Sequence, residues 1–400
     1  GVTMEVEMGT SLMEVLSKAD FARPYPILVA RVNNRYKELS HRIFKPVTVE
    51  FLDVRHYEGY RVYQRTISFV MQMAATELFP ERKLRIRHTL GSGFYAQFEN
   101  GVVPTAEELA LLKERMTDIV ERDLAITRRK RLAEEVAEEY AHYGFDDRLD
   151  LLETRPHLYR TVNYLGQMPG YFYGALAPSS GYVRHFDIAP YYNGFYVALP
   201  ERSNPEAVST NIHLDKMFDI FHEYQQWIDI MGVPTVGELN RRVMEGDASE
   251  LIKIAEAFHE NKIANIARAI SEANKERGVR MALISGPSSS GKTTFSKRLG
   301  VQLRVLGLDP VLIALDEYFV DRDKTPLDED GKPDFEALEA IDLATLNDHL
   351  QRLAAGESVE IPRYDFISGK RQWHENPLRL TNRSILILEG IHALNPRLTP

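Results

Sequence analysis

Apolar residues recur at helical spacing in the segment RTISFVMQMAATELFP, residues 65–80, and the repeat stops before Pro80. This spacing places the apolar side chains on one face of a helix, and proline cannot continue a helix interior. The sequence therefore predicts an amphipathic helix at this point. The residues of its apolar face are Ile67, Val70, Met71, Ala74 and Leu78.

Other segments combine the same period with helix start and stop signals. Residues 104–123, PTAEELALLKERMTDIVERD, begin with Thr105 as a cap and carry acidic residues in the first turn. Residues 129–144 and 249–278 each have an apolar stripe and end at a glycine, which is a common helix stop. A shorter helix is expected over residues 10–19.

Shorter apolar stretches predict strands. The Asn33–Asn34 pair lies between two of them, and asparagine tolerates the positive φ of a hairpin turn. Apolar and polar residues in RKLRIRHTL and GFYAQFE, within residues 82–99, predict two more strands. Residues 281–284, 310–315 and 384–388 are continuous apolar runs, which are typical of strands buried on both faces of a parallel sheet.

Turn-rich segments separate these patterns. PERSNPEAV, residues 200–208, joins prolines, charges and asparagine, and we interpret it as the best domain boundary. GVPTVGELN, residues 232–240, is also rich in turn residues. We expect these residues to form an interdomain loop. A less favoured interpretation is that they cover a binding site formed by the last third of the chain.

Composition narrows the class of protein. The chain has 400 residues, enough for two to three domains, with 44% hydrophobic and 27% charged residues, as in globular proteins. A formal net charge of -9 restricts any RNA contact to local basic patches, such as RKLRIRH and TRRKRL. The lack of cysteine excludes disulfides and thiolate metal sites and fits a cytoplasmic protein. No apolar run is long enough to span a membrane.

The segment ISGPSSSGKTTFSKRLG contains the pattern G-x-x-x-x-G-K-[ST], between an apolar strand and a helix-forming segment at residues 294–306. In this arrangement backbone N–H groups surround phosphates, Lys292 reaches the β and γ phosphates, and Thr293 ligates magnesium. The sequence therefore predicts an ATP site. Its expected nucleotide-binding residues are Gly286, Ser288, Ser289, Ser290, Gly291, Lys292, Thr293 and Thr294.

An acidic residue follows each of two buried strands: Asp316 and Glu389. Ligands of open α/β sheets bind outside the carboxyl ends of the strands, so both acids are expected to converge on the phosphate loop. We interpret Asp316 as the catalytic base, with Lys292 as the second catalytic residue. Glu389 and Thr293 are the expected magnesium ligands, and no zinc is expected. A single acid after a strand is more often a helix cap or a solvated loop residue, and its combination with the loop favours catalysis.

The motifs GPSSSGKTT, LDEYF, PRYDFISGKRQW and ILEGIHAL resemble, in order and approximate spacing, those of the uridine kinase and phosphoribulokinase family. The resemblance covers about residue 280 to the end. It implies transfer of the γ-phosphoryl group of ATP to a nucleoside 5′-hydroxyl, with Asp316 as the base. It also implies that Tyr318, Glu336 and Tyr364 contact the acceptor.

Departures from the family pattern concern the acceptor. Tyr318 and Phe319 are exchanged relative to the family's D-x-F-Y, and Glu336 replaces an aspartate near the ribose. Gly369 falls where a histidine typically contacts the base. We therefore expect nucleoside phosphorylation without committing to uridine. Aromatic residues nearby that could rebuild the pocket, although packing is their commoner role, are Trp373 and His374.

A kinase of this family normally has a lid and further strands after its second acidic strand. Only GIHALNPRLTP follows that strand in this sequence. We therefore expect that the C-terminal part of the kinase domain, with the family's phosphate-binding lid arginines, is missing.

The front of the chain resembles the N-terminal part of threonyl-tRNA synthetases. GTSLMEVL, ILVARVNNRYKELSHRI and VTVEFLDV resemble the ubiquitin-like TGS domain, and residues 65–99 begin a resemblance to the second additional, or editing, domain. In those synthetases an H-x-x-x-H pair and a C-x-x-x-H pair form a metal-binding or deacylating centre. The four aligned positions are occupied by Arg65, Phe69, Phe172 and Leu176. Three are apolar and one is a permanent cation, so we expect packing residues in place of that centre and no deacylase chemistry.

These patterns together predict a multidomain α+β and α/β chain. We expect a ubiquitin-like TGS domain at 1–60, an editing-like α+β domain at 61–205, a helical connector at 206–279 and a P-loop kinase with a parallel sheet at 280–400. The expected function is phosphorylation of a nucleoside or a similar sugar hydroxyl with ATP and magnesium. The alternative is an RNA-associated nucleotide-binding regulatory protein without kinase activity. RNA contact by the front domains and homo-oligomerisation stay open, and no membrane partner is expected.

Overall fold

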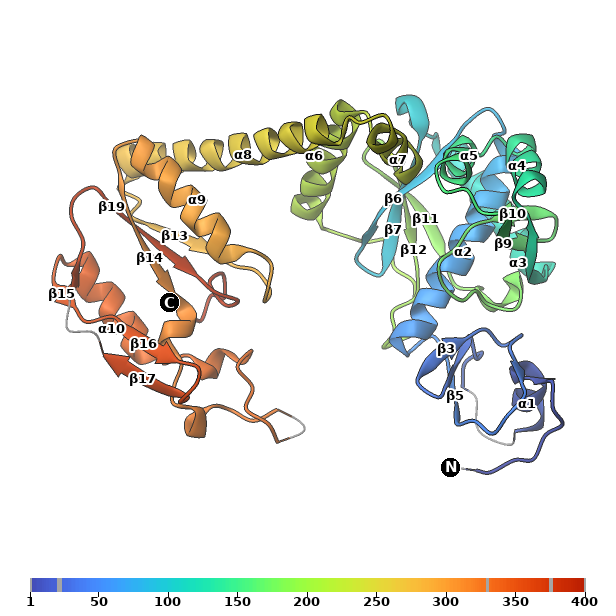
Figure 1. The fold of residues 1–400 in the computed structure, drawn as a ribbon, viewed down its shortest axis with the longest axis horizontal. Helices are drawn as coiled ribbons and strands as arrows, with labels where there is room; N and C mark the ends of the chain where they lie inside the picture. Colours follow the sequence, from blue (N-terminus) through green and yellow to red (C-terminus); the bar gives the residue numbers. More distant parts are fainter. Residues whose placement is uncertain (1, 20–23, 329–330, 374–376, 399–400) are drawn as a thin grey trace. The chain divides into compact units, whose positions relative to one another are not determined.

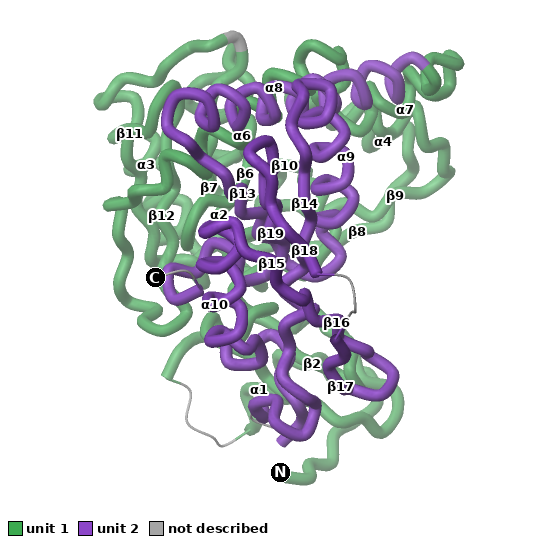
Figure 2. The backbone as a smooth tube through the Cα atoms, turned by 90° about the vertical axis from the view of Figure 1, so that its left-hand side faces the viewer, with its two compact units in different colours: residues 1–249 green, residues 250–400 purple. Residues whose placement is uncertain are grey.

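The chain forms two compact units, residues 1–249 and 250–400 (Figure 2). The predicted mixture of helices and strands, with a parallel sheet, is confirmed. Among the placed residues, no helix is both long and apolar enough to cross a membrane. The computed structural model describes residues 2–19, 24–328, 331–373 and 377–398.

The first sixty residues form a small module in which a helix covers a short sheet. Strands β3, β2 and β5 pair antiparallel in that order, and Asn33 and Asn34 connect β2 to β3 with φ angles of 45° and 63°. The predicted hairpin is therefore confirmed. Leu12 and Leu16 of the helix belong to the core of the module. Its elements are β1 (Thr10–Ser11), α1 (Leu12–Lys18), β2 (Val29–Val32), β3 (Arg35–Lys37), β4 (Arg42–Ile43) and β5 (Val49–Leu52).

The rest of the first unit surrounds one long helix, α2, with two antiparallel sheets (Figure 1). The sheets have the strand orders β11-β12-β7-β6 and β10-β9-β8. Ile67, Val70 and Met71 of α2 are fully buried in this core, as the helical spacing predicts. The elements are α2 (Tyr57–Leu78), β6 (Leu84–Leu90), β7 (Gly93–Phe98), α3 (Ala106–Glu121), β8 (Ile126–Leu132), α4 (Ala133–His142), α5 (Asp146–Glu153), β9 (Tyr159–Leu165), β10 (Met168–Gly170), β11 (Asp187–Tyr191) and β12 (Gly194–Ala198).

The sequence signals for where a helix begins predict the start of α3 correctly and the start of α4 incorrectly. Thr105 caps α3 as predicted, because its hydroxyl accepts from the Glu108 N–H at 3.2 Å and Glu108 accepts from the Thr105 N–H at 2.9 Å. The helix expected over residues 129–144 is wrong in its first turn. Residues up to Leu132 form strand β8, because pairing with β9 overrides the helix propensity of arginine and lysine.

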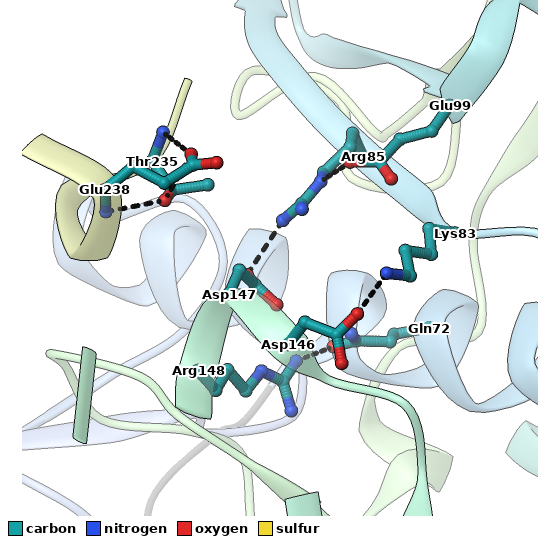
Figure 3. Close-up of polar contacts among 9 residues, drawn as sticks. All are labelled: Gln72, Lys83, Arg85, Glu99, Asp146, Asp147, Arg148, Thr235 and Glu238. Atoms are coloured by element: carbon teal, nitrogen blue, oxygen red, sulfur yellow. Dashed lines mark hydrogen bonds and ion pairs between the residues drawn. The ribbon is translucent and has the colours of Figure 1, made fainter. Parts of the chain in front are cut away.

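Residues 232–240 are not an interdomain loop, because they contain the start of a helix. The first unit ends with α6 (Asp215–Met231) and α7 (Val236–Met244), and Thr235 and Glu238 form a capping box at the start of α7 (Figure 3). Helix α7 lies tightly against α5. A Cβ atom on Gly237 would be 2.5 Å from the Cβ of Asp150, and the same Asp150 carboxylate pairs with Arg241.

Helix α5 is held in turn by the polar contacts at its start that Figure 3 shows. Asp147 pairs with Arg85 of β6 at 2.8 Å, and Asp146 pairs with Lys83. Arg148 donates to the Gln72 side chain of α2 at 2.5 Å. These contacts fix α5, and through it α7, to the core of the first unit.

The second unit is built on a parallel sheet with the strand order β13-β19-β14 (Figure 1). All three strands begin or end within one residue of the predicted apolar runs, and β19 lies in the centre. The long helix predicted at residues 249–278 is confirmed as α8. The elements are α8 (Ala248–Arg277), β13 (Met281–Ile284), α9 (Lys292–Val305), β14 (Asp309–Ala314), α10 (Leu343–Ala354), β15 (Ser358–Val359), β16 (Pro362–Asp365), β17 (Lys370–Trp373), β18 (Leu378–Arg379) and β19 (Ser384–Glu389).

Candidate active site

The loop between β13 and α9 has the backbone of an anion-binding turn. Ser289 and Gly291 have positive φ angles of 59° and 88°, and α9 begins at the next residue, Lys292. A Cβ atom on Gly286 would lie 2.8 Å from the Ser290 hydroxyl oxygen, so the loop folds back closely on itself. Such a turn directs successive N–H groups toward one concave side, and the helix N-terminus adds partial positive charge.

Two side chains at the start of α9 connect the loop to its surroundings. Lys292 Nζ donates to the Pro287 carbonyl at 3.0 Å, across the loop. Thr293 Oγ1 donates to Glu389 Oε1 at 2.8 Å, at the end of the central strand β19. Residues Gly286 to Thr294 thus form one continuous loop and helix start, and the loop residues 287–291 are exposed.

Glu389 and Thr293 fit a magnesium ion. Glu389 is 7% exposed, and its Oε2 atom is buried without a hydrogen-bond partner. A buried carboxylate oxygen without a partner is costly, and a hydroxyl and a carboxylate are the hard oxygen ligands that magnesium prefers. Among the described residues no group of three or more His, Cys, Asp or Glu could hold a metal. Magnesium sites beside phosphates need only one or two carboxylates.

Asp316 lies at the same edge of the sheet, directly after β14, in the short 3-10 turn η3 (Leu315–Tyr318). The surrounding protein partly desolvates its carboxylate although the side chain stays open to solvent, and this raises the pKa of Asp316. The positive charge of Lys292 opposes the rise, and the negative charges of Glu389 and Glu317 add to it. The structure therefore brings Asp316 within electrostatic reach of both Lys292 and Glu389.

On the acceptor side, the structure turns Tyr318 inward. Its side chain is fully buried, and its hydroxyl lies 3.1 Å from His349 Nδ1. Burial also raises the pKa of Tyr318. The adjacent ring of Phe319 instead packs 5.6 Å from that of Tyr364. Tyr318, which the motifs predict to contact the acceptor, therefore has its hydroxyl next to His349 in the core.

Tyr364 itself is 3% exposed, and its hydroxyl has no hydrogen-bond partner. The Tyr364 N–H donates to Glu317 Oε2 at 2.8 Å, which fixes strand β16 against the turn that carries Asp316. Sequence reasoning missed this role of Glu317, because the two residues lie 47 positions apart and no local pattern links them. The Glu336 side chain is exposed, and its backbone carbonyl lies 2.7 Å from His392 Nε2.

Gly369 cannot be replaced by a histidine without a shift of its neighbour. Its φ angle is +68°, and a Cβ atom there would lie 2.8 Å from Arg322 Nε. The ring of Trp373 is 6.0 Å from that of His349, and the Arg371 guanidinium lies over it at 5.3 Å. His374 lies outside the described residues.

The four positions matched from the sequence to the synthetase metal ligands also lie together, in the first unit. Phe69 of α2 packs on Phe172 with ring centroids 5.0 Å apart. Arg65 donates to the Ala175 carbonyl at 2.9 Å and pairs with Glu58 at 2.8 Å, while the adjacent Leu176 is 2% exposed. Packing and a paired cation therefore occupy this place.

A strand, a left-handed glycine loop and a helix, with two acids at the same edge of a parallel sheet, have the arrangement of a P-loop. Residues 282–397 match the model of the Phosphoribulokinase / Uridine kinase family. The uridine kinase of Tolumonas auensis is 36% identical over 114 residues, which are 28% of this chain and 52% of that protein.

The front of the chain is similar to other proteins. The threonine–tRNA ligase of Symbiobacterium thermophilum is 29% identical over 189 residues, which are 47% of this chain and 29% of the ligase. Both resemblances expected from the motifs are thus confirmed. A solved structure of a possible uridine kinase from Bacillus stearothermophilus is 24% identical with a TM-score of 0.30, covering 34% of this chain and 74% of that one. This chain spans about half, or less, of the length of these curated relatives.

Proposed function

We propose that the second unit transfers the γ-phosphoryl group of ATP to a hydroxyl of a nucleoside or a similar sugar, with magnesium. One observation carries this proposal: Lys292, Thr293 and Glu389 meet at the phosphate loop, and Asp316 lies in reach of the same charges. The similarity to uridine kinases supports the class of reaction.

In the proposed reaction, the loop N–H groups and Lys292 hold the phosphates, and Thr293 and Glu389 hold the metal. Bound magnesium neutralises negative charge on the phosphate oxygens. Asp316 accepts the proton of the acceptor hydroxyl as its oxygen bonds to the γ-phosphorus and the bond to the ADP oxygen breaks. The raised pKa of Asp316 makes its carboxylate a stronger base than an ordinary aspartate.

The acceptor pocket is proposed to lie beside Phe319 and Tyr364. The buried, unpartnered hydroxyl of Tyr364 would bond a polar group of the acceptor, and the buried Phe319 ring packs beside Tyr364. Glu336 is the proposed ribose contact. Because Gly369 leaves no side chain where the family has a histidine, uridine is not singled out among nucleosides.

A nucleoside panel with ATP and magnesium tests this function. We expect acceptor-dependent ADP release from the wild type, and a loss of about 100-fold or more in kcat for both Lys292→Ala and Asp316→Asn. Lys297→Ala is the matched control, because Lys297 is an exposed lysine of the same helix α9. Full activity of Asp316→Asn, or no phosphorylated acceptor in the panel, would refute the proposed mechanism.

A second candidate function rests on a different surface. Strand β8 exposes Arg128, Arg129 and Lys130 in the unit that is similar to threonine–tRNA ligases. Such a local basic strand would suit an RNA-associated protein in which nucleotide binding is regulatory. Salt-dependent RNA binding, together with an absence of acceptor-dependent ATP turnover, would favour this candidate over the kinase.

A further inference from the structure

We propose that helix α8, which lies outside the family-matched segment, is part of the frame of the nucleotide site, and that Glu260 is a positioning residue for the P-loop helix α9. The proposal rests on the function above only in taking MgATP as the ligand. Three sets of contacts within the second unit carry it.

The first set joins α8 stiffly to the strand before the loop. Helix α8 ends at Arg277, and the next residue, Gly278, has a φ angle of +68° and donates its N–H to the Asn274 carbonyl at 3.0 Å. The Asn274 side chain then donates to the Val279 carbonyl at 2.8 Å. Only three residues, 278–280, separate the end of α8 from β13, so the direction of α8 fixes the direction in which β13 enters the loop.

The second set clamps α8 to the helix after the loop. One oxygen of Glu260 accepts from Arg298 at 2.6 Å, and the other accepts from the Gln302 side chain at 2.6 Å. These two donors lie one turn apart on α9, so a single carboxylate fixes both the rotation and the axial position of that helix. Hydrogen bonds from Gln302 and Arg298 lower the pKa of Glu260, so the carboxylate stays charged at neutral pH.

The third set is apolar. Ile263 and Ala267 of α8 are fully buried against Leu299 and Leu303 of α9. The same cluster includes Ile385 and Ile387 of the central strand β19, which leads to Glu389. Helix α8 therefore shares one apolar cluster with both elements that carry the expected magnesium ligands.

These contacts connect α8 to the elements on both sides of the phosphate loop. The loop begins after β13 and ends at α9, and α8 holds both of these elements. An axial shift of α9 by even 1 Å would move Lys292 and Thr293 relative to Glu389, and the Thr293–Glu389 bond of 2.8 Å would not survive it. Glu260 thus acts through α9 on the site, without contact to the ligand.

Calorimetric titration of the full chain with MgATP tests the role of Glu260 without any need for acceptor or turnover. We expect Glu260→Ala to raise the Kd for MgATP by about 3- to 10-fold, since about 1.4 kcal/mol corresponds to a factor of ten. Glu256→Ala, one turn earlier on α8 and exposed, should leave the Kd unchanged.

A charge exchange separates positioning from general stability. Glu260→Arg and Arg298→Glu should each weaken MgATP binding, and the double variant should recover most of the affinity because the pair is rebuilt with reversed charges. Melting temperatures are measured beside each titration. If Glu260→Ala lowers the melting temperature and leaves the Kd unchanged, Glu260 is only structural and the inference is wrong. If the wild type itself does not bind MgATP, both this inference and the proposed function are wrong.

Discussion

Two places in this chain are expected, from its motifs, to correspond to functional centres of other proteins, and they differ in how their side chains fill the space. In the first unit, Phe69 and Phe172 pack together at two of the positions matched to metal ligands from the sequence, and the one charged group, Arg65, is paired and hydrogen-bonded. In the second unit, the loop is exposed, and Glu389 keeps a buried oxygen without a partner. The same backbone fold can be present with or without a function, because function depends on whether polar atoms at the site are free to bind a ligand.

This difference leads us to propose separate roles for the two units. The first retains its fold for binding or domain organisation, since its aligned positions offer neither metal ligands nor free polar atoms of the kind a deacylating centre needs. The second retains hard oxygen ligands and a raised-pKa acid beside a phosphate loop.

The largest effect is expected on the stability of the first unit, at the packed contact between Phe69 and Phe172. Phe69 is fully buried, so Phe69→Ala should lower the free energy of unfolding of the first unit by about 3–5 kcal/mol. The shift in denaturant midpoint of that unit's transition measures it. Leu111→Ala is the control, because Leu111 is 50% exposed and its removal should cost under about 0.5 kcal/mol. A Phe69→Ala effect as small as that of the control would show that the place is not packed.

An intermediate effect is expected on the magnesium requirement of the second unit, at Glu389. Glu389→Gln removes the negative charge of the expected metal ligand, so we expect the magnesium concentration at half-maximal nucleotide binding to rise about 10- to 100-fold. Titrating magnesium at constant ATP measures this concentration. Glu276→Gln, at an exposed position of α8, serves as the neutral control. An unchanged magnesium requirement in Glu389→Gln would remove Glu389 from the metal site.

The smallest effect concerns the stability cost of Asp316. A carboxyl group whose pKa is raised by folding favours the folded state while protonated, and this contribution is lost as pH rises through the folded pKa. At pH 7 the ionised Asp316 therefore destabilises the fold. We expect Asp316→Asn to raise the melting temperature of the second unit by about 1–3 °C at pH 7. The gain should vanish below the ordinary aspartate value of 3.8. A variant that melts lower than the wild type at pH 7 would contradict this cost.

The sequence predicts those features whose causes are local. Thr105 and Glu108 are three residues apart, so the cap of α3 can be read from the chain, and the same holds for the strand, loop and helix around Lys292. Helix α7 was missed although Thr235 and Glu238 form the same capping box, because the preceding turn residues suggested a loop. That signal was present and could have corrected the interpretation.

Features that depend on distant residues could not be predicted in this way. The contact of Phe69 with Phe172 and the bond from Tyr364 to Glu317 join separate parts of the chain. Tyr318 and Phe319 are both buried but contact different partners, and this depends on the short turn η3, where neither the helical nor the strand period applies. The sequence places these residues near the site but cannot orient them.

The close packing of α7 on α5 has a practical consequence for producing the first unit by itself. Gly237 lies so near Asp150 that the two helices share one surface, and Arg241 and Asn240 bond to Asp150 and Thr154. A polypeptide stopped after β12 would uncover this surface and leave the Asp150 carboxylate without its arginine. One continued through Met244 would keep it covered, and should be the more soluble of the two.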